Sequence, residues 1–185
     1  MTTARTATWT AAPTLAVVAL VAGCGEPVAG SPVATGEHGP AGAGRALASF
    51  DPCAVLSDAE LTALGFRPET RDPIDELGQM GCGFLGSRDS PVLGIRLEKD
   101  LEETVDDYAA RSEAFGSFEE NRVNGRPGAV LEVVGDGRGC VQLMNAGSGT
   151  VAVDWQFDDP GPVDPCAEAL RVAEMIEAEL PAVGS

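Results

Sequence analysis

The chain has 185 residues, of which 12 are basic and 29 acidic, so its formal net charge at pH 7 is −17. A surface this acidic is repelled by phosphate backbones and by anionic lipid headgroups. The composition therefore argues against nucleic-acid binding and against a globular part that lies on a membrane.

The N-terminus has the organisation of a secretory signal peptide. An apolar stretch over residues 11–23 ends in small residues directly before a cysteine, in the order Leu20-Val21-Ala22-Gly23-Cys24, which is typical of a lipobox. The stretch is too short for a membrane-spanning helix, which needs about 20 apolar residues. We therefore predict a lipoprotein signal peptide over residues 1–23 and lipidation of Cys24. Ordinary signal cleavage, with Cys24 as a bystander, is the alternative.

The predicted anchor places the protein on the extracytoplasmic face of the cell membrane, with the membrane as a partner through lipid. Stable attachment takes more than one acyl chain. Residues 24–49 are rich in Gly, Pro and Ala and have no apolar period, which is typical of a flexible tether. The only histidine, His38, lies in this tether, which argues against histidine-dependent catalysis in the domain.

Residues 50–185 are expected to form a single domain, because their number supports one core but not two. Ser57 and Glu60 have the spacing of a capping box, which predicts a helix over Ser57–Leu64. A polar, proline-containing loop follows. Apolar alternation then predicts two strands, over residues 82–85 and 92–98.

Asp100 and Glu103 repeat the capping pattern and predict an amphipathic helix over about residues 101–114. Asn124-Gly125 is a strong signal for a hairpin turn. On either side of such turn signals the sequence predicts four more strands, over residues 118–123, 129–134, 139–146 and 150–157.

The strand predicted over residues 150–157 has the clearest alternation. We therefore expect one of its faces to pack in the core and the other to be exposed to solvent. A final helix opens at Asp164-Pro165-Cys166 and ends at Pro181. Short turns between strands imply antiparallel pairing. The predicted fold class is therefore α+β, an antiparallel β-sheet with helices packed on one face, stapled by disulfides.

Four cysteines remain beside Cys24, and an even number in an exported chain predicts two disulfides. We predict that Cys53 pairs with Cys166, because both follow Asp-Pro and lead into helices near the two ends of the domain. Cys82 would then pair with Cys140, since both lie in predicted strands. The main competing pattern joins Cys53 to Cys82 and Cys140 to Cys166.

The domain lacks the residues of a nucleophilic hydrolase. No histidine follows the tether and Lys99 is the only lysine, so no base is available to activate a serine or cysteine. Adjacent acidic residues remain as candidates for an acid and a base, at Asp106-Asp107, Glu119-Glu120 and Asp158-Asp159. Asp158, Asp159 and Asp164 are a weak candidate for calcium binding. We predict no catalytic residue, no metal and no cofactor.

Several motifs carry a resemblance: the lipobox, the tether, Phe50-Asp51-Pro52-Cys53, Gly81-Cys82-Gly83-Phe84 and Asp164-Pro165-Cys166. Together they resemble the actinobacterial lipoproteins grouped as domain of unknown function 3558, over nearly all of the domain. Phe84 departs from the tryptophan that members often have. The resemblance implies an exported, lipid-anchored domain without known catalytic residues.

Two functions of different class are compatible with these features of the sequence. The first is a binding or interaction module of the cell envelope, with a neighbouring envelope protein or a small ligand as its partner. The alternative is a carboxylate-dependent envelope hydrolase. Carboxylates that converge in a partly desolvated pocket would favour the enzyme, whereas a shallow or apolar groove would favour binding.

Overall fold

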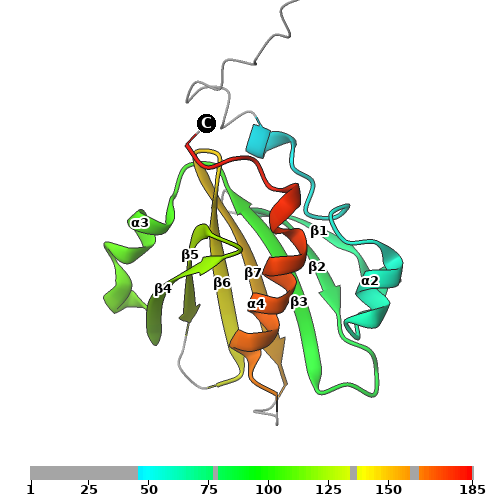
Figure 1. Ribbon diagram of the computed structural model, residues 1–185. Coiled ribbons are helices and arrows are strands. Elements are labelled where there is room, and N and C mark those ends of the chain that lie inside the picture. The colour runs from blue at the N-terminus through cyan, green and yellow to red at the C-terminus, as the bar shows by residue number, and fades with distance from the viewer. Residues whose placement is uncertain (1–45, 77–78, 134–136, 159–162, 185) are drawn as a thin grey trace, which may run out of the picture. The chain divides into compact units, whose positions relative to one another are not determined.

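The computed structural model describes residues 46–76, 79–133, 137–158 and 163–184. Its helices and strands, shown in Figure 1, are α2 (Asp58–Ala63), β1 (Asp72–Glu76), β2 (Gln79–Leu85), β3 (Val92–Asp100), α3 (Val105–Ala109), β4 (Ser117–Val123), β5 (Arg126–Glu132), β6 (Gly139–Ala146), β7 (Gly149–Phe157) and α4 (Pro165–Ile176). Three short 3₁₀ turns accompany them, η1 (Pro68–Thr70), η2 (Ser112–Ala114) and η3 (Glu177–Glu179). Within these described ranges, no helix is long and apolar enough to cross a membrane.

The strands form a seven-stranded sheet in the order β1-β2-β3-β7-β6-β5-β4, and every neighbouring pair is antiparallel. The β4–β5 hairpin turns at Asn124 and Gly125, whose φ angles of 50° and 92° are both positive, as a tight two-residue turn requires. A second tight hairpin joins β6 to β7 through Gly147 and Ser148. The predicted α+β class with an antiparallel sheet is confirmed.

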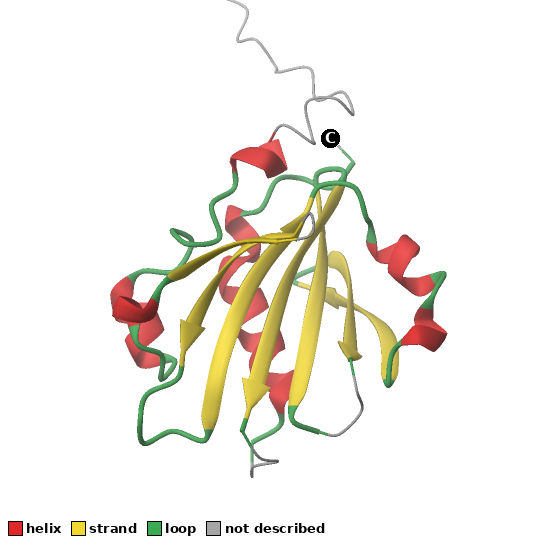
Figure 2. Ribbon diagram, turned by 180° about the vertical axis from the view of Figure 1, so that it is seen from behind, coloured by secondary structure: helices red, strands yellow, loops and turns green. Residues whose placement is uncertain are grey.

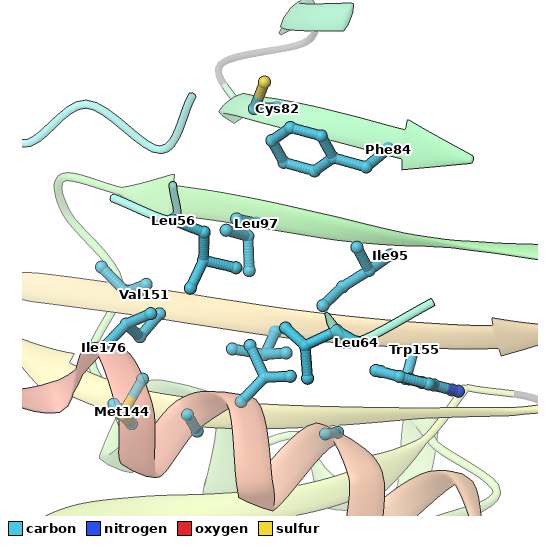
Figure 3. Packing of buried hydrophobic residues seen from close by; sticks show 14 of the residues in the cluster. Leu56, Leu64, Cys82, Phe84, Ile95, Leu97, Met144, Val151, Trp155 and Ile176 are labelled. Atoms are coloured by element: carbon cyan, nitrogen blue, oxygen red, sulfur yellow. The ribbon is translucent and has the colours of Figure 1, made fainter. Parts of the chain in front are cut away.

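The main core lies between the sheet and helix α4, which crosses it (Figure 1). Helix α4 buries residues at the three-and-four spacing of an amphipathic helix, namely Ala169, Val172, Ala173 and Ile176. Figure 3 shows the side chains that they meet, pointing inward from β3, β7 and the segment around α2: Ile95, Leu97, Val151, Trp155, Leu56 and Leu64. We call this side of the sheet the α4 face.

The opposite side of the sheet is only partly covered. Figure 2 shows its strands in front of α4, with α3 at one margin. Val105 of α3 packs on Ala129, Leu131 and Leu143, and strand alternation places these residues on the side away from α4. We call this side the groove face, and it is marked by Ala152 of β7.

The helix predicted over residues 101–114 is much shorter in the structure. Asp100 still belongs to β3, and its carboxylate accepts hydrogen bonds from the backbone N–H groups of Glu102 and Glu103 in a turn. The capping box is formed instead by Thr104 and Asp107, so α3 begins at Val105. The first predicted helix is confirmed, because Ser57 and Glu60 cap each other at the start of α2.

The packed part of the chain begins before residue 50, where the predicted tether ends. Residues 46–49 are helical and Leu47 is fully buried in the main core. Lys99 holds this segment, since its Nζ donates hydrogen bonds to the carbonyl oxygens of Leu47, Ala48 and Phe50 at 3.3, 2.7 and 2.5 Å. Burial lowers the pKa of Lys99, while the nearby carboxylate of Asp51 acts against this shift.

The predicted disulfide pairing is wrong, and the competing pattern is present. Cys53 is bonded to Cys82, and Cys140 to Cys166. The reason is the strand order: β3 and β7 separate β2, which carries Cys82, from β6, which carries Cys140. Three strand spacings amount to about 14 Å, too far for a disulfide. Each observed bridge instead ties a strand to a neighbouring segment, and the second fastens the start of α4 to β6.

The two edges of the sheet are polar. Strand β1, where the sequence predicts a loop, carries Asp72, Pro73 and Asp75 along one edge. An edge strand tolerates proline because one side of its backbone needs no ladder partner. Strand β4 forms the other edge and exposes Glu119 and Glu120.

Candidate functional site

The groove face is hollowed by adjoining pockets. The most enclosed has a volume of 240 Å³ and lies between the sheet and the segment formed by α3 and η2. Two shallower depressions, of 760 and 460 Å³, adjoin it, and Arg96 lines all three. The three therefore adjoin one another around Arg96.

The pairing of β3 with β7 brings the polar residues of the groove together. Arg96 lies opposite Asp154, and Glu98 lies opposite Ala152, so that the charged side chains share one face. Their neighbours in sequence, such as Leu97, point to the α4 face. The alternation that builds the core thus also assembles a charged cluster on its reverse side. We call Arg96, Glu98, Asp154 and Gln156 the polar cluster.

The side chains of the polar cluster pair with one another. Gln156 Nε2 donates to Asp154 Oδ2 at 2.7 Å. Arg96 Nη2 forms an ion pair with Glu98 Oε1 at 2.6 Å. The Glu98 side chain in this pair is 13% exposed and that of Arg96 is 41% exposed, so the ion pair is partly buried.

Both carboxyl groups of the cluster have raised pKa values. Burial is the main cause for Glu98; the charge of Arg96 acts against it, and that of Asp154 raises the pKa further. Burial also raises the pKa of Asp154, against the hydrogen bond from Gln156 and the charge of Arg96. The folded protein therefore holds two carboxylates where water solvates them poorly, which is typical of functional sites.

This arrangement predicts that Asp154→Asn stabilises the fold at pH 7. A carboxyl group with a raised pKa binds its proton more readily in the folded state, so its ionisation lowers stability as the pH rises from the unfolded pKa through the folded one. The gain in unfolding free energy over wild type should exceed about 0.5 kcal/mol, the usual range for surface substitutions. It should shrink as the pH falls toward 4. Urea unfolding from pH 4 to 8 measures it, with the exposed Glu119→Gln as control, and a destabilised Asp154→Asn at pH 7 would contradict it.

Apolar and aromatic side chains form part of the walls of the enclosed pocket. Tyr108 and Phe115 stand on one side, with their rings stacked at 6.2 Å. The sheet supplies Leu131, Val141 and Leu143. A concave site with apolar walls and a few convergent polar groups is the usual form of a small-molecule site.

Among the residues that the structure describes, the acidic candidates predicted from the sequence do not come together in one site. Cys24, His38 and Asp159 lie outside the described residues. Asp107 caps α3, and Glu119 and Glu120 are exposed on β4, where successive side chains point to opposite faces. In the described ranges, no group of three or more His, Cys, Asp or Glu residues could hold a metal ion.

Sequence reasoning missed the polar cluster. The alternation of the last strand predicted that Asp154 and Gln156 lie on a solvent-exposed face. In the structure, α3 and η2 partly cover this face, and Thr150, which lies on it as well, is only 1% exposed. The signal was present in part, since Arg96 and Glu98 alternate with apolar residues just as Asp154 does. The missing element was the register that sets β3 beside β7.

The fold and the groove define a disulfide-stapled α+β domain with a small, partly charged pocket on the less covered face of its sheet. Residues 19–179 match the family described as "Protein of unknown function (DUF3558)", and the chain belongs to this family. No curated protein and no solved structure matches the chain.

Proposed function

We propose that this protein is a lipoprotein held on the extracytoplasmic face of the cell membrane by acyl chains on Cys24, and that its domain is a binding module of the cell envelope. The lipobox supports the anchor. The two disulfides support export, because such bonds persist mainly in oxidising compartments. An actinobacterial origin is supported by eleven arginines against one lysine in an Ala- and Gly-rich chain, as in proteins of GC-rich genomes.

The binding function rests on one observation, the enclosed pocket of 240 Å³ on the groove face, which sets the partly buried charges of Arg96, Glu98 and Asp154 beside apolar and aromatic side chains. A concave site of this kind is typical of ligand binding. We therefore place the ligand-binding site in this pocket.

The anchor predicts that Cys24→Ala moves the protein from the membrane fraction to the soluble extracytoplasmic fraction. The reason is that the variant lacks the residue that carries the acyl chains, while the acidic domain has no affinity of its own for anionic headgroups. Fractionation with immunodetection measures the distribution, and mass spectrometry of the wild type should find acylated Cys24. Ser31→Ala, in the same tether, is the control and should stay in the membrane. A wild-type protein that is fully soluble would contradict the proposal.

A carboxylate-dependent hydrolase is the second candidate, and one observation favours it. Glu98 and Asp154 line the same pocket with raised pKa values, as a general acid and base would. Chromogenic ester, amide and glycoside substrates test it with wild type, Asp154→Asn and Glu98→Gln. Turnover by the wild type that both variants lose would establish the enzyme; turnover that survives in both would exclude this site.

A further inference from the structure

The tip of the β4–β5 hairpin carries the dipeptide Asn124-Gly125, and both of its residues are exposed. The tip points toward α4 (Figure 1), where Asn124 Nδ2 donates to the backbone carbonyl oxygen of Glu174 at 3.1 Å. Glu174 belongs to the last turn of α4, whose carbonyl oxygens form the negative end of the helix dipole. The amide group of Asn124 thus fastens the hairpin to the end of the helix.

The glycine at position 125 leaves its own backbone nitrogen open to reaction with the Asn124 side chain. Gly125 has no Cβ, and apart from its chain neighbours no atom lies within 4 Å of the place that a Cβ would take. The Asn124 side chain directly precedes this nitrogen in the chain. An attack of the nitrogen on the side-chain amide carbon therefore closes an unstrained succinimide ring.

The chain has two other asparagines, Asn121 and Asn145, and both lie inside strands. Each is followed by a residue with a Cβ, which shields the backbone nitrogen. Asn121 exchanges two hydrogen bonds with the side chain of Gln142, at 2.8 and 2.9 Å. Asn145 Oδ1 accepts a hydrogen bond from the backbone N–H of Val105 at 2.8 Å. These two residues are internal references for the hairpin tip.

We propose that Asn124 is a site of spontaneous deamidation in the folded protein. The backbone nitrogen of Gly125 loses its proton to solvent base and bonds to Asn124 Cγ, while the bond from Cγ to Nδ2 breaks and ammonia leaves. Water then opens the succinimide at either carbonyl and leaves aspartate or isoaspartate at position 124. Besides the protein, water is the only reactant consumed. The inference does not depend on the proposed function, because it needs neither the lipid anchor nor the pocket.

Deamidation would reverse the effect of this side chain on α4. The product has no N–H group to donate to the Glu174 carbonyl oxygen, and it places a carboxylate at the negative end of the helix dipole. Isoaspartate also lengthens the backbone of a tight turn, in which Asn124 has a φ of 50°. The hairpin should therefore loosen from α4 once the site has reacted.

Peptide mapping by mass spectrometry tests the inference on the detergent-solubilised full-length protein, incubated at pH 8. The same chain, reduced and unfolded in guanidinium chloride, gives the rate at which each asparagine reacts without structure. One neutral hydrogen bond and one restrained residue each slow the attack about tenfold. Folding should therefore slow the reaction of Asn124 by less than about a hundredfold, and that of Asn121 and Asn145 by more. Slowing of Asn124 beyond this limit, or equal to that of the other two, would overturn the inference.

Two variants separate the lost donor from the added charge. Asn124→Asp reproduces one product, whereas Asn124→Gly removes the amide alone, because glycine readily adopts the positive φ of this turn. Native-state hydrogen exchange in the last turn of α4 should be about threefold faster than wild type in Asn124→Gly and about tenfold faster in Asn124→Asp. Circular dichroism checks that both variants fold. Exchange that stays at the wild-type rate in Asn124→Asp would show that deamidation does not loosen the hairpin from α4.

Discussion

Loss of the Cys140–Cys166 disulfide should lower the free energy of unfolding by about 3.5 kcal/mol. The bridge spans 26 residues, and the chain-entropy account of disulfides assigns this order of magnitude to the closure of such a loop. The variant is the double substitution Cys140→Ala with Cys166→Ala, which leaves no free thiol. Urea unfolding measures the difference.

The matched control removes the other bridge by Cys53→Ala with Cys82→Ala. Its span of 29 residues predicts nearly the same loss of stability, so the location of the loss distinguishes the two. Native-state hydrogen exchange should speed up at the start of α4 in the first variant and around residues 53–58 in the second. Non-reducing peptide mapping that joins Cys53 to Cys166 would contradict the pairing on which both expectations depend.

Replacement of Lys99 by methionine should cost about 2 to 3 kcal/mol. Methionine preserves most of the buried stem but removes the donor to three carbonyl oxygens, those of Leu47, Ala48 and Phe50. The oxygen of Leu47 keeps a second donor, the backbone N–H of Phe50 at 3.1 Å. Hydrogen bonds to charged groups contribute about 1.5 to 3 kcal/mol each, and the desolvation of the ammonium offsets part of this sum. The segment that places Leu47 in the core should loosen with it.

Arg88→Met is the control for Lys99→Met. It removes the same charge at an exposed position between β2 and β3 and should change stability by less than about 0.5 kcal/mol. Urea unfolding gives the stabilities, and limited proteolysis should cut the Lys99 variant near residues 46–52 before any other site. Equal stability of the two variants would show that the hydrogen bonds of Lys99 do not hold this segment.

Features that depend on neighbours in sequence could be predicted. The capping box of Ser57 and Glu60, the Asn124-Gly125 turn and the alternation of β7 are each set within a few residues, and the structure has all three. These local signals, with the short turns, were enough to give the fold class. The family resemblance also rested on short motifs, and the family is confirmed.

Features that depend on the order and register of the strands could not be predicted. Local patterns do not say that β7 inserts between β3 and β6, and this insertion separates Cys82 from Cys140. The same insertion sets Arg96 beside Asp154 and so creates the polar cluster. One topological fact thus accounts for both the wrong disulfide pairing and the missed site.

The polar edges of the sheet restrict how this domain can recognise a partner. An extended peptide often binds by adding a strand to an open edge, where backbone hydrogen bonds supply affinity. Strand β1 opposes such addition with Pro73, which has no N–H to donate, and with two acids beside it, while β4 presents Glu119 and Glu120. Recognition by strand addition is therefore disfavoured at both edges of the sheet. Selectivity for a partner then depends on the side chains on the two faces of the sheet.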